Sequence, residues 1–579
     1  MATIAEVEAN DTNKTNRNES QSVDITVRIG IFFDGTNNNR AQVMMGRLAR
    51  EKKGGTSQEE NNEILATMNI DKLDVIERSY IENSEDKIQA KRKVLKFRNW
   101  LRPGMPRTMM QNVGFTNVAI LERFYQPIDQ ADYIYKVYVT GSGTSADVSE
   151  GVNVAGLAAG QGSTGVVQKI WDAMDAIYTK INFVNFDKSI SGVNYVFDVF
   201  GFSRGATEAR LFVDLCCNRE GRPPVLLKGI KRYNRLFSNK ENNSEKQIKF
   251  PLQKENGIKF NVGIYDTVAS VGVIRNPQWA PAALSESVTG IELVSKTAST
   301  FHDENVADLG LNTVAYDESV KKVIHICALD EYRENFALCA LPNGGKVEQF
   351  FMPGIHTDIG GSELEGYRGK LSIPVIIKKK QLIVEPSVYN EAPITNCIHE
   401  RLRLPRVAPL KDCVEMTVEN LKHLGWLKDF SNTPQDINQI DVIIDNDGFE
   451  LLEFKDDDSL DSIDVDRYSI GVFSNLTLAI MAEKHSDVFK DLIMIKGKHA
   501  IPDNLPMSYD DMKETWEGCN SNFGHCYFPK AEKDYQDLRL RYLHFSSSAS
   551  SVNGPHYNDD FCYERLLYTE KGTETLIGN

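Results

Sequence analysis

The sequence has no apolar run of about 18 residues, the length that a membrane-spanning helix requires. Its first residues are acidic and contain no apolar core segment, so we expect no secretory signal. Basic residues are not in excess, because 66 Lys and Arg stand against 81 Asp and Glu, and the formal net charge is −15. This balance argues against general binding of nucleic acid.

Cysteine is present without a pairing pattern. The nine cysteines are scattered, Cys216 and Cys217 are adjacent, and no C-x-x-C array occurs. Neither a zinc site nor a disulfide framework is indicated. We therefore expect buried reduced thiols, no bound metal and no cofactor.

The chain has 579 residues, which is too long for one simple core. We expect a polar, disordered tail over residues 1–22 and an α/β-hydrolase catalytic domain with insertions over 23–369. A second, mostly helical module over 370–535 and a tail over 536–579 that returns to the catalytic domain complete the predicted organisation.

The catalytic region alternates short apolar strands with helical segments, which predicts an α/β fold with a mostly parallel sheet and helices on both faces. Polar residues gather just after several of these strands, where open α/β sheets build their sites. The predicted strands are Asp24–Phe33, Tyr133–Val139, Tyr195–Phe200, Ile258–Tyr265, Lys322–Leu329, Val347–Met352 and, in the tail, Leu538–Phe545; the predicted helices include Val166–Ile181, Ala206–Cys217 and Tyr468–Lys490.

One of these strand ends has the pattern of a nucleophile elbow. The strand Tyr195–Phe200 runs into Gly201-Phe202-Ser203-Arg204-Gly205, and a helix follows at once. A serine on so tight a turn needs strained backbone angles, and bulky residues two positions away would collide with the strand and the helix. The alternative is that Ser203 merely caps the helix from Arg204.

A serine nucleophile needs a histidine base and a carboxylate that orients the base. In α/β-hydrolases the chain order is Ser, acid, His, and Ser203, Asp266 and His356 satisfy it, each after its own predicted strand. His356 lies in a Gly-rich loop, which we expect to leave the imidazole free to reach the serine. Asp330 and His544 are the alternative acid and base.

Oxyanion stabilisation requires backbone N–H groups near the nucleophile. The Arg204 amide, at the start of the predicted helix, is the first expected donor. We expect the second from Gly35 or Thr36, after the first strand, with Thr140-Gly141-Ser142-Gly143 as the alternative. A phosphate-binding role for the latter segment is disfavoured because it lacks the Lys of a P-loop.

Five sequence blocks follow one another along the chain: Phe32-Phe33-Asp34-Gly35-Thr36-Asn37-Asn38, Thr140-Gly141-Ser142-Gly143-Thr144, Gly201-Phe202-Ser203-Arg204-Gly205-Ala206, Tyr265-Asp266-Thr267-Val268 and Pro353-Gly354-Ile355-His356-Thr357-Asp358-Ile359-Gly360-Gly361. In this order they resemble family 1 of the bacterial type VI secretion lipase effectors, which are α/β-hydrolases of an uncharacterised-domain type. The resemblance covers roughly residues 25–365.

The resemblance implies an antibacterial phospholipase A that attacks membrane glycerophospholipids in the periplasm of a target cell. It also implies a VgrG-type spike protein as carrier and a cognate immunity protein in the producer. The family nucleophile, acid and base fall on Ser203, Asp266 and His356, the same three residues that the strand ends indicate. A different serine carboxylesterase or lipase, or a non-catalytic adaptor bound to the spike, are the alternative functions.

Two further segments have ambiguous patterns. Residues 87–107 carry eight basic and no acidic residues, with aromatic residues between them. Such a helix suits a headgroup layer, but we expect a solvated helix with an apolar core face. The acidic run Asp456-Asp457-Asp458 is expected to be a solvated loop rather than a calcium site.

Overall fold

A computed structural model describes the chain in segments. They are residues 23–40, 114–128, 131–144, 165–184, 190–217, 248–269, 310–342, 345–362, 372–374, 440–444, 450–454, 473–489, 564–570 and 572–577, with isolated residues between them. All structural statements below concern this part of the chain.

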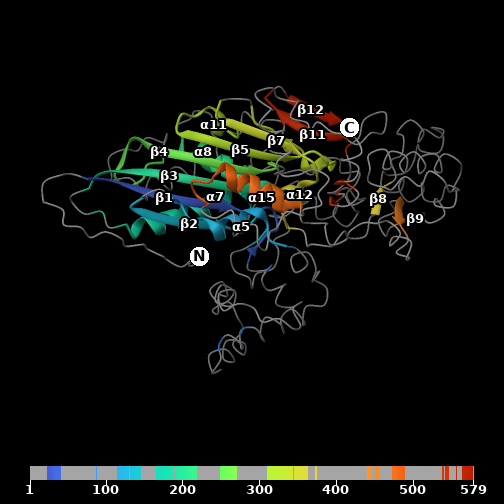
Figure 1. Cartoon of the computed structure of the whole chain (residues 1–579), viewed down its shortest axis with the longest axis horizontal. Helices are drawn as coiled ribbons and strands as arrows, with labels where there is room; N and C mark the ends of the chain where they lie inside the picture. The colour runs from blue at the N-terminus through green and yellow to red at the C-terminus, as the bar shows by residue number, and fades with distance from the viewer. Residues whose placement is uncertain are drawn as a thin grey trace, which may run out of the picture.

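The centre of the molecule is a six-stranded sheet in the order β2-β1-β3-β4-β5-β7. Every neighbouring pair in this sheet is parallel. The predicted α/β fold with a mostly parallel sheet is therefore confirmed (Figure 1). The strands are β1 (Val23–Phe33), β2 (Tyr133–Val139), β3 (Ile190–Phe202), β4 (Gln253–Tyr265), β5 (Val320–Ala328) and β7 (Val347–Met352).

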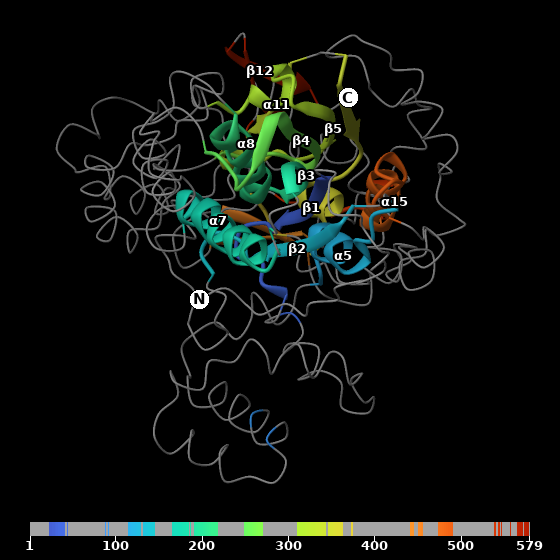
Figure 2. The ribbon, with the colours of Figure 1, turned by 90° about the vertical axis from the view of Figure 1, so that its left-hand side faces the viewer.

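Helices cover both faces of the sheet (Figure 2). α7 (Val166–Asn182) and α8 (Arg204–Cys216) pack on one face. α5 (Asn117–Phe124) and α15 (Phe473–Lys484) lie on the other. Successive strand residues point to opposite faces, so a strand covered on both sides must be apolar almost throughout. That requirement explains the nearly unbroken apolar run at the end of β1.

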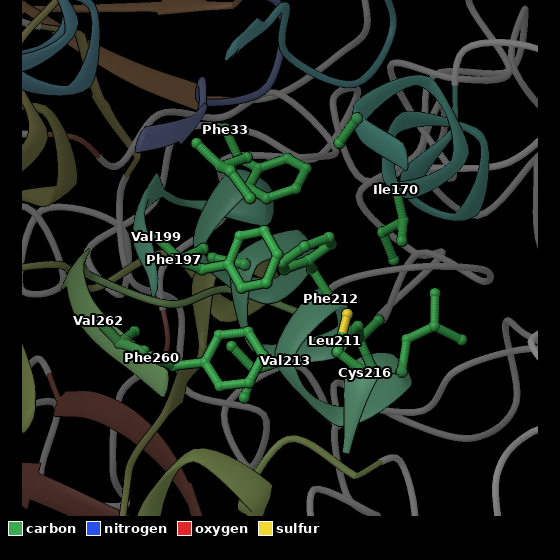
Figure 3. Close-up of a cluster of buried hydrophobic side chains, with 14 of the residues drawn as sticks. Phe33, Ile170, Phe197, Val199, Leu211, Phe212, Val213, Cys216, Phe260 and Val262 are labelled. Carbon is green, nitrogen blue, oxygen red and sulfur yellow. The ribbon is translucent and has the colours of Figure 1, made fainter. Parts of the chain in front are cut away.

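The largest core lies between the sheet and α7 and α8 (Figure 3). Phe197 of β3 meets Phe212 of α8 edge to face, with ring centres 5.9 Å apart. Phe260 of β4 stacks on Phe197 at 5.4 Å. The described cysteines Cys216, Cys217, Cys327 and Cys339 are all buried, as expected.

Beyond the carboxyl end of β5 the chain forms several short elements. They are the 3₁₀ turn η5 (Glu334–Phe336), β6 (Leu338–Cys339) and the helix α12 (His356–Gly360); α11 (Thr313–Tyr316) precedes β5. β6 pairs in parallel with β11 (Glu564–Thr569), which forms a hairpin with β12 (Gly572–Ile577). The last part of the chain thus lies beside the loops that end the main sheet (Figure 1).

The structure corrects the predicted tail strand and leaves the predicted helical module open. The predicted strand Leu538–Phe545 is wrong, because Leu538 and Arg539 are helical and Tyr542 lies in a turn. In 370–535 the described residues form the antiparallel strands β8 (Ser372–Pro374), β10 (Glu450–Phe454) and β9 (Ile440–Ile444), besides α15. α15 itself packs against α5 and α12, so it covers the catalytic sheet. The mostly helical module and the domain boundaries stay predictions, because most of that range lies outside the described residues.

Candidate active site

Ser203 occupies a strained turn between β3 and α8. Its φ is +60° and its ψ is −127°, a combination that ordinary side chains rarely adopt. The turn is held on one side by the Ser203 N–H, which donates to the Tyr265 carbonyl at 3.0 Å, and on the other by the Val268 N–H, which donates to the Ser203 carbonyl at 3.3 Å. The Ser203 side chain makes no capping hydrogen bond to α8. Helix capping therefore does not explain this serine, whereas a nucleophile elbow does.

The two elbow glycines are required by close packing. A Cβ on Gly201 would overlap the backbone of Gly205 and Ala206. A Cβ on Gly205 would overlap the carbonyl oxygens of Phe33 and Asp34 at the end of β1. In both cases the obstacle is main chain, which cannot move aside without shifting a strand or helix. The sequence pattern Gly-x-Ser-x-Gly is thus a steric consequence of this turn.

Asp266 and His356 meet at the carboxyl end of the sheet. His356 Nδ1 lies 2.6 Å from Asp266 Oδ2, and both side chains are buried. The alternative residues pair elsewhere: Asp330 accepts from Arg539 at 2.6 Å, and His544 Nδ1 lies 2.6 Å from Asp358. Of the acids and bases considered from the sequence, the structure brings together Asp266 and His356.

The electrostatics suit an ionised acid beside a neutral base. Burial acts to raise the pKa of Asp266, but the charge of Arg565 and the hydrogen bond from His356 outweigh it and hold that pKa at about 2. Burial lowers the pKa of His356 below its usual 6.5, although the bond to Asp266 opposes this shift. At neutral pH the imidazole is therefore unprotonated and ready to accept a proton.

The imidazole of His356 is held between two aromatic rings. Its centre lies 4.6 Å from that of Phe202 in the elbow and 5.1 Å from that of Phe336 in η5. His356 is the first residue of α12, so the expectation of a loop without a helix is wrong. Its Nε2 is buried and makes no hydrogen bond to any described residue. This atom is the one that a base must keep available for the nucleophile, and such bonds often tighten only when substrate binds.

The expected oxyanion donors lie next to the elbow. Arg204 opens α8, where the first N–H groups have no acceptor within the helix. A Cβ on Gly35 would overlap the ring of Phe202, which places the Asp34–Thr36 turn against the elbow. The Gly35 N–H donates to Asp34 Oδ1 at 2.7 Å, whereas no described residue accepts a hydrogen bond from the Thr36 N–H. The Thr36 N–H is therefore the less committed of these two backbone donors.

The alternative segment interlocks with this turn. The Gly141 N–H donates to the Asn38 carbonyl at 2.8 Å, and the Asn37 N–H donates to the Ser142 carbonyl at 2.9 Å. Ser142 Oγ also lies 2.5 Å from Glu208 of α8. The segment Thr140–Thr144 thus supports the Asp34–Asn38 turn through main-chain and side-chain bonds.

Sequence reasoning missed Arg565. Its guanidinium is fully buried, and Nη2 lies 3.0 Å from both carboxylate oxygens of Asp266, 299 positions away in the chain. In the sequence, the signal that could have pointed to Arg565 is its position directly before the apolar residues Leu566-Leu567-Tyr568 of a short strand. Such a residue must find a partner when the strand is buried.

Two segments singled out in the sequence lie mostly or wholly outside the described residues. Except for Lys87 and Lys91, the segment 87–107 is outside them, as is Asp456-Asp457-Asp458. Among the helices that the structure describes, none has the length and apolar character needed to cross a bilayer.

The parallel sheet, the elbow at the end of β3 and the buried Asp266–His356 pair define an α/β-hydrolase arrangement. Residues 106–374 match the family model described as "T6SS, Phospholipase effector Tle1-like, catalytic domain". This match confirms the resemblance drawn from the sequence blocks, and residues 106–374 are similar to the catalytic domain of Tle1-like phospholipase effectors of type VI secretion. β1 and the Asp34–Asn38 turn precede the matched segment.

Two solved structures are similar over most of the chain. The first is described as the Tle1 effector bound to the VgrG spike from the type 6 secretion system; it is 17% identical, with 99% of this chain and 96% of that chain covered and a TM-score of 0.44. The second is an uncharacterized protein from Pseudomonas aeruginosa, 11% identical, with 95% and 80% covered and a TM-score of 0.32. No curated protein matches the chain.

Proposed function

We propose that this protein is an antibacterial phospholipase A. It hydrolyses fatty-acyl esters of membrane glycerophospholipids through a Ser203–His356–Asp266 triad and an acyl-enzyme intermediate. The observation that carries the proposal is the 2.6 Å contact of Asp266 with His356 in a domain whose elbow serine has a φ of +60°. The Tle1-like family match supports the choice of phospholipid as substrate.

The proposed reaction is acyl transfer in two steps. Ser203 Oγ attacks the ester carbonyl while His356 Nε2 takes its proton, and Asp266 stabilises the imidazolium that forms. His356 then gives that proton to the departing lysophospholipid oxygen. Water, deprotonated in turn by His356, attacks the acyl-enzyme, and fatty acid leaves as the proton returns to Ser203.

The negative charge on the carbonyl oxygen is stabilised by backbone amides in this proposal. We assign one to Arg204 and the other to Thr36, with Gly35 as its neighbour in the same turn. The Arg204 amide gains from its place at the start of a 13-residue helix, where the helix dipole favours negative charge. No step of this chemistry needs a metal or cofactor.

Delivery follows the family description, in which these phospholipases are effectors of type VI secretion. We propose that a VgrG-type spike carries the protein into a rival cell, where it acts on membranes from the periplasm. A cognate immunity protein would protect the producer. Targeting the protein to the periplasm of a susceptible host should be toxic, and cytoplasmic expression should not.

The decisive experiment measures fatty-acid release from phospholipid vesicles by wild type and by Ser203→Ala. Wild type should release fatty acid and lysophospholipid, and the variant should retain less than about 10⁻³ of that rate. Release by Ser203→Ala at the wild-type rate overturns the triad. Cleavage of short soluble esters with no release from vesicles indicates a carboxylesterase instead.

A fluorophosphonate probe separates the enzyme from the adaptor alternative. The probe should label wild type at Ser203 and leave Ser203→Ala unlabelled. Absence of labelling together with absence of fatty-acid release supports a non-catalytic adaptor. The position of the released acyl chain, read from a phospholipid labelled differently at its two acyl positions, then identifies the ester bond that is cut.

A further inference from the structure

Three buried carboxylates near His356 are each held by a basic side chain from residues 538–570, here called the C-terminal segment. Asp266 is bound by Arg565, Asp330 by Arg539 and Asp358 by His544; the nitrogen–oxygen distances are 3.0, 2.6 and 2.6 Å. These carboxylates follow β4, follow β5 and lie in α12, respectively. The C-terminal segment therefore supplies the partner of every one of these acids.

Arg565 makes the contact that reaches the triad itself. Nη2 lies 3.0 Å from Oδ1 and 3.0 Å from Oδ2 of Asp266, while Oδ2 is also the atom that meets His356. Nη1 donates to the carbonyls of Glu331 at 3.1 Å and Phe336 at 2.7 Å. One side chain thus fixes the plane of the Asp266 carboxylate relative to the loop that carries Phe336, and Phe336 contacts the imidazole.

The fold delivers Arg565 to this position through β6. The Cys339 N–H of β6 donates to the Thr267 carbonyl at 2.9 Å, next to Asp266. On its other side β6 pairs with β11, with Leu338 opposite Leu567 and Cys339 opposite Tyr568. Arg565, two residues before Leu567, is consequently brought against the end of β4.

We propose that Arg565 is a positioning residue for the triad acid: its buried guanidinium keeps the Asp266 carboxylate ionised and aimed at His356 Nδ1. The inference rests on the proposed triad. A carboxylate buried without compensation would favour its protonated form, and a protonated Asp266 is a poor partner for an imidazolium. The low pKa of Asp266, about 2 despite full burial, agrees with this role.

Other charged groups also face the base. Glu331 accepts from the His356 N–H at 3.2 Å and is paired with Arg333, whose guanidinium lies over the Phe336 ring. Arg333 is satisfied by Glu331 at 2.7 Å, so it does not replace Arg565 as the partner of Asp266. Removing Arg565 removes the one cation that contacts the triad carboxylate among the described residues.

The test measures the second-order rate of Ser203 labelling by a fluorophosphonate against pH in four proteins. In wild type the labelling rate should be constant at neutral pH, the plateau, and should fall at low pH as His356 is protonated, which is the acid limb. In Arg565→Gln the limb should move to higher pH, because loss of a nearby cation makes protonation of the coupled Asp266–His356 pair more favourable, and the plateau should fall by roughly tenfold to 10³-fold. Arg565→Lys restores the charge and should return the limb, with a plateau still below wild type because the fork geometry is lost.

Arg539→Gln is the matched control. It also removes a buried guanidinium of the C-terminal segment and takes the arginine partner from Asp330, so its thermal stability should fall about as much as that of Arg565→Gln, but its acid limb should stay in place. A limb that does not move in Arg565→Gln overturns the inference while leaving the triad intact. If Arg565→Gln does not fold, a wild-type plateau in Arg565→Lys overturns it instead. Failure to label wild type at Ser203 overturns the proposed function, and this inference with it.

Discussion

The ring of Phe202 lies 4.6 Å from the imidazole of His356, centre to centre, at an interplanar angle of 34°. This contact joins the elbow to the base, since Phe202 immediately precedes Ser203 in the chain. Two glycines also pack against this ring: a Cβ on Gly35 or Gly360 would overlap it. Phe202 thereby connects the β1 turn, the elbow and α12.

Replacing Phe202 with Leu should slow labelling of Ser203 by between roughly tenfold and 100-fold, because the imidazole loses the surface that fixes its orientation. Phe200→Leu is the matched control, since Phe200 is equally buried in β3 but packs on Phe32 and His485. Both variants should lose a similar few degrees of melting temperature. Equal labelling rates in the two variants would contradict a role for Phe202 in holding His356.

Gly205→Ala should abolish activity and reduce soluble expression, because the added Cβ meets the carbonyls of Phe33 and Asp34. The comparison variant is Gly345→Ala, where a Cβ has no neighbour within 4 Å. That change should leave the melting temperature and the ester-hydrolysis rate near wild type. Thermal unfolding and soluble-ester assays of the two variants check the expectation; a stable, active Gly205→Ala protein would contradict the described packing of α8 on β1.

Asp266→Asn should lower kcat by roughly 10⁴-fold, because a neutral amide neither stabilises the imidazolium nor fixes its tautomer. Asp330→Asn should cause a much smaller loss, since Asp330 bonds to Arg539 and to the Gly354 N–H rather than to the His356 ring. Steady-state kinetics on a soluble ester measure both. If the two losses come in the reverse order, Asp330 is the acid.

The acid limb of the kcat/KM profile should be centred below pH 6.5. Burial lowers the pKa of His356 below 6.5, so its neutral, proton-accepting form persists into mildly acidic solution. Hydrolysis of a soluble ester between pH 4.5 and 8 checks this, with circular dichroism at each pH to confirm that the protein remains folded. An acid limb centred above pH 7 would mean that the Asp266 charge outweighs burial.

Stability should fall as the pH drops below 6.5, partly because of His325 in β5. Burial and the charge of Arg210 lower its pKa to about 3. The folded state therefore excludes a proton that the unfolded state binds below pH 6.5, and each such group costs at most about 1.4 kcal/mol per pH unit between these two pKa values. Urea unfolding at pH 7, 6 and 5 measures the slope.

His325→Gln should reduce that slope by about one proton. The imidazole accepts from the Thr267 N–H at 3.2 Å and lies 2.9 Å from Gln349, so the variant will also be less stable at pH 7. The slope and the absolute stability are separate readouts. An unchanged slope would show that His325 takes up a proton in the folded protein.

Much of the catalytic sheet was predictable because its signals are local. β2 and β7 begin and end at the predicted residues. α7 ends one residue later than predicted, and α8 begins two residues earlier and ends one residue earlier. Buried parallel strands need continuous apolar runs, and these runs stand out between polar turns. The tail strand Leu538–Phe545 was predicted from the same kind of run and is wrong, because Leu538 and Arg539 are helical and Tyr542 lies in a turn.

The sequence by itself determined the elbow, because Gly-x-Ser-x-Gly directly after an apolar strand is a local signal, and the Cβ that Gly201 lacks would meet the nearby Gly205 and Ala206. It also supplied the order Ser203, Asp266, His356. Only the tertiary structure decided that Asp266, not Asp330, contacts His356, and that Arg565 pairs with Asp266. The physical reason is that these pairings depend on strands that are far apart in the chain but adjacent in space, β4 beside β5 and β11 beside β6. A charge buried between such strands is unfavourable unless an opposite charge pairs with it.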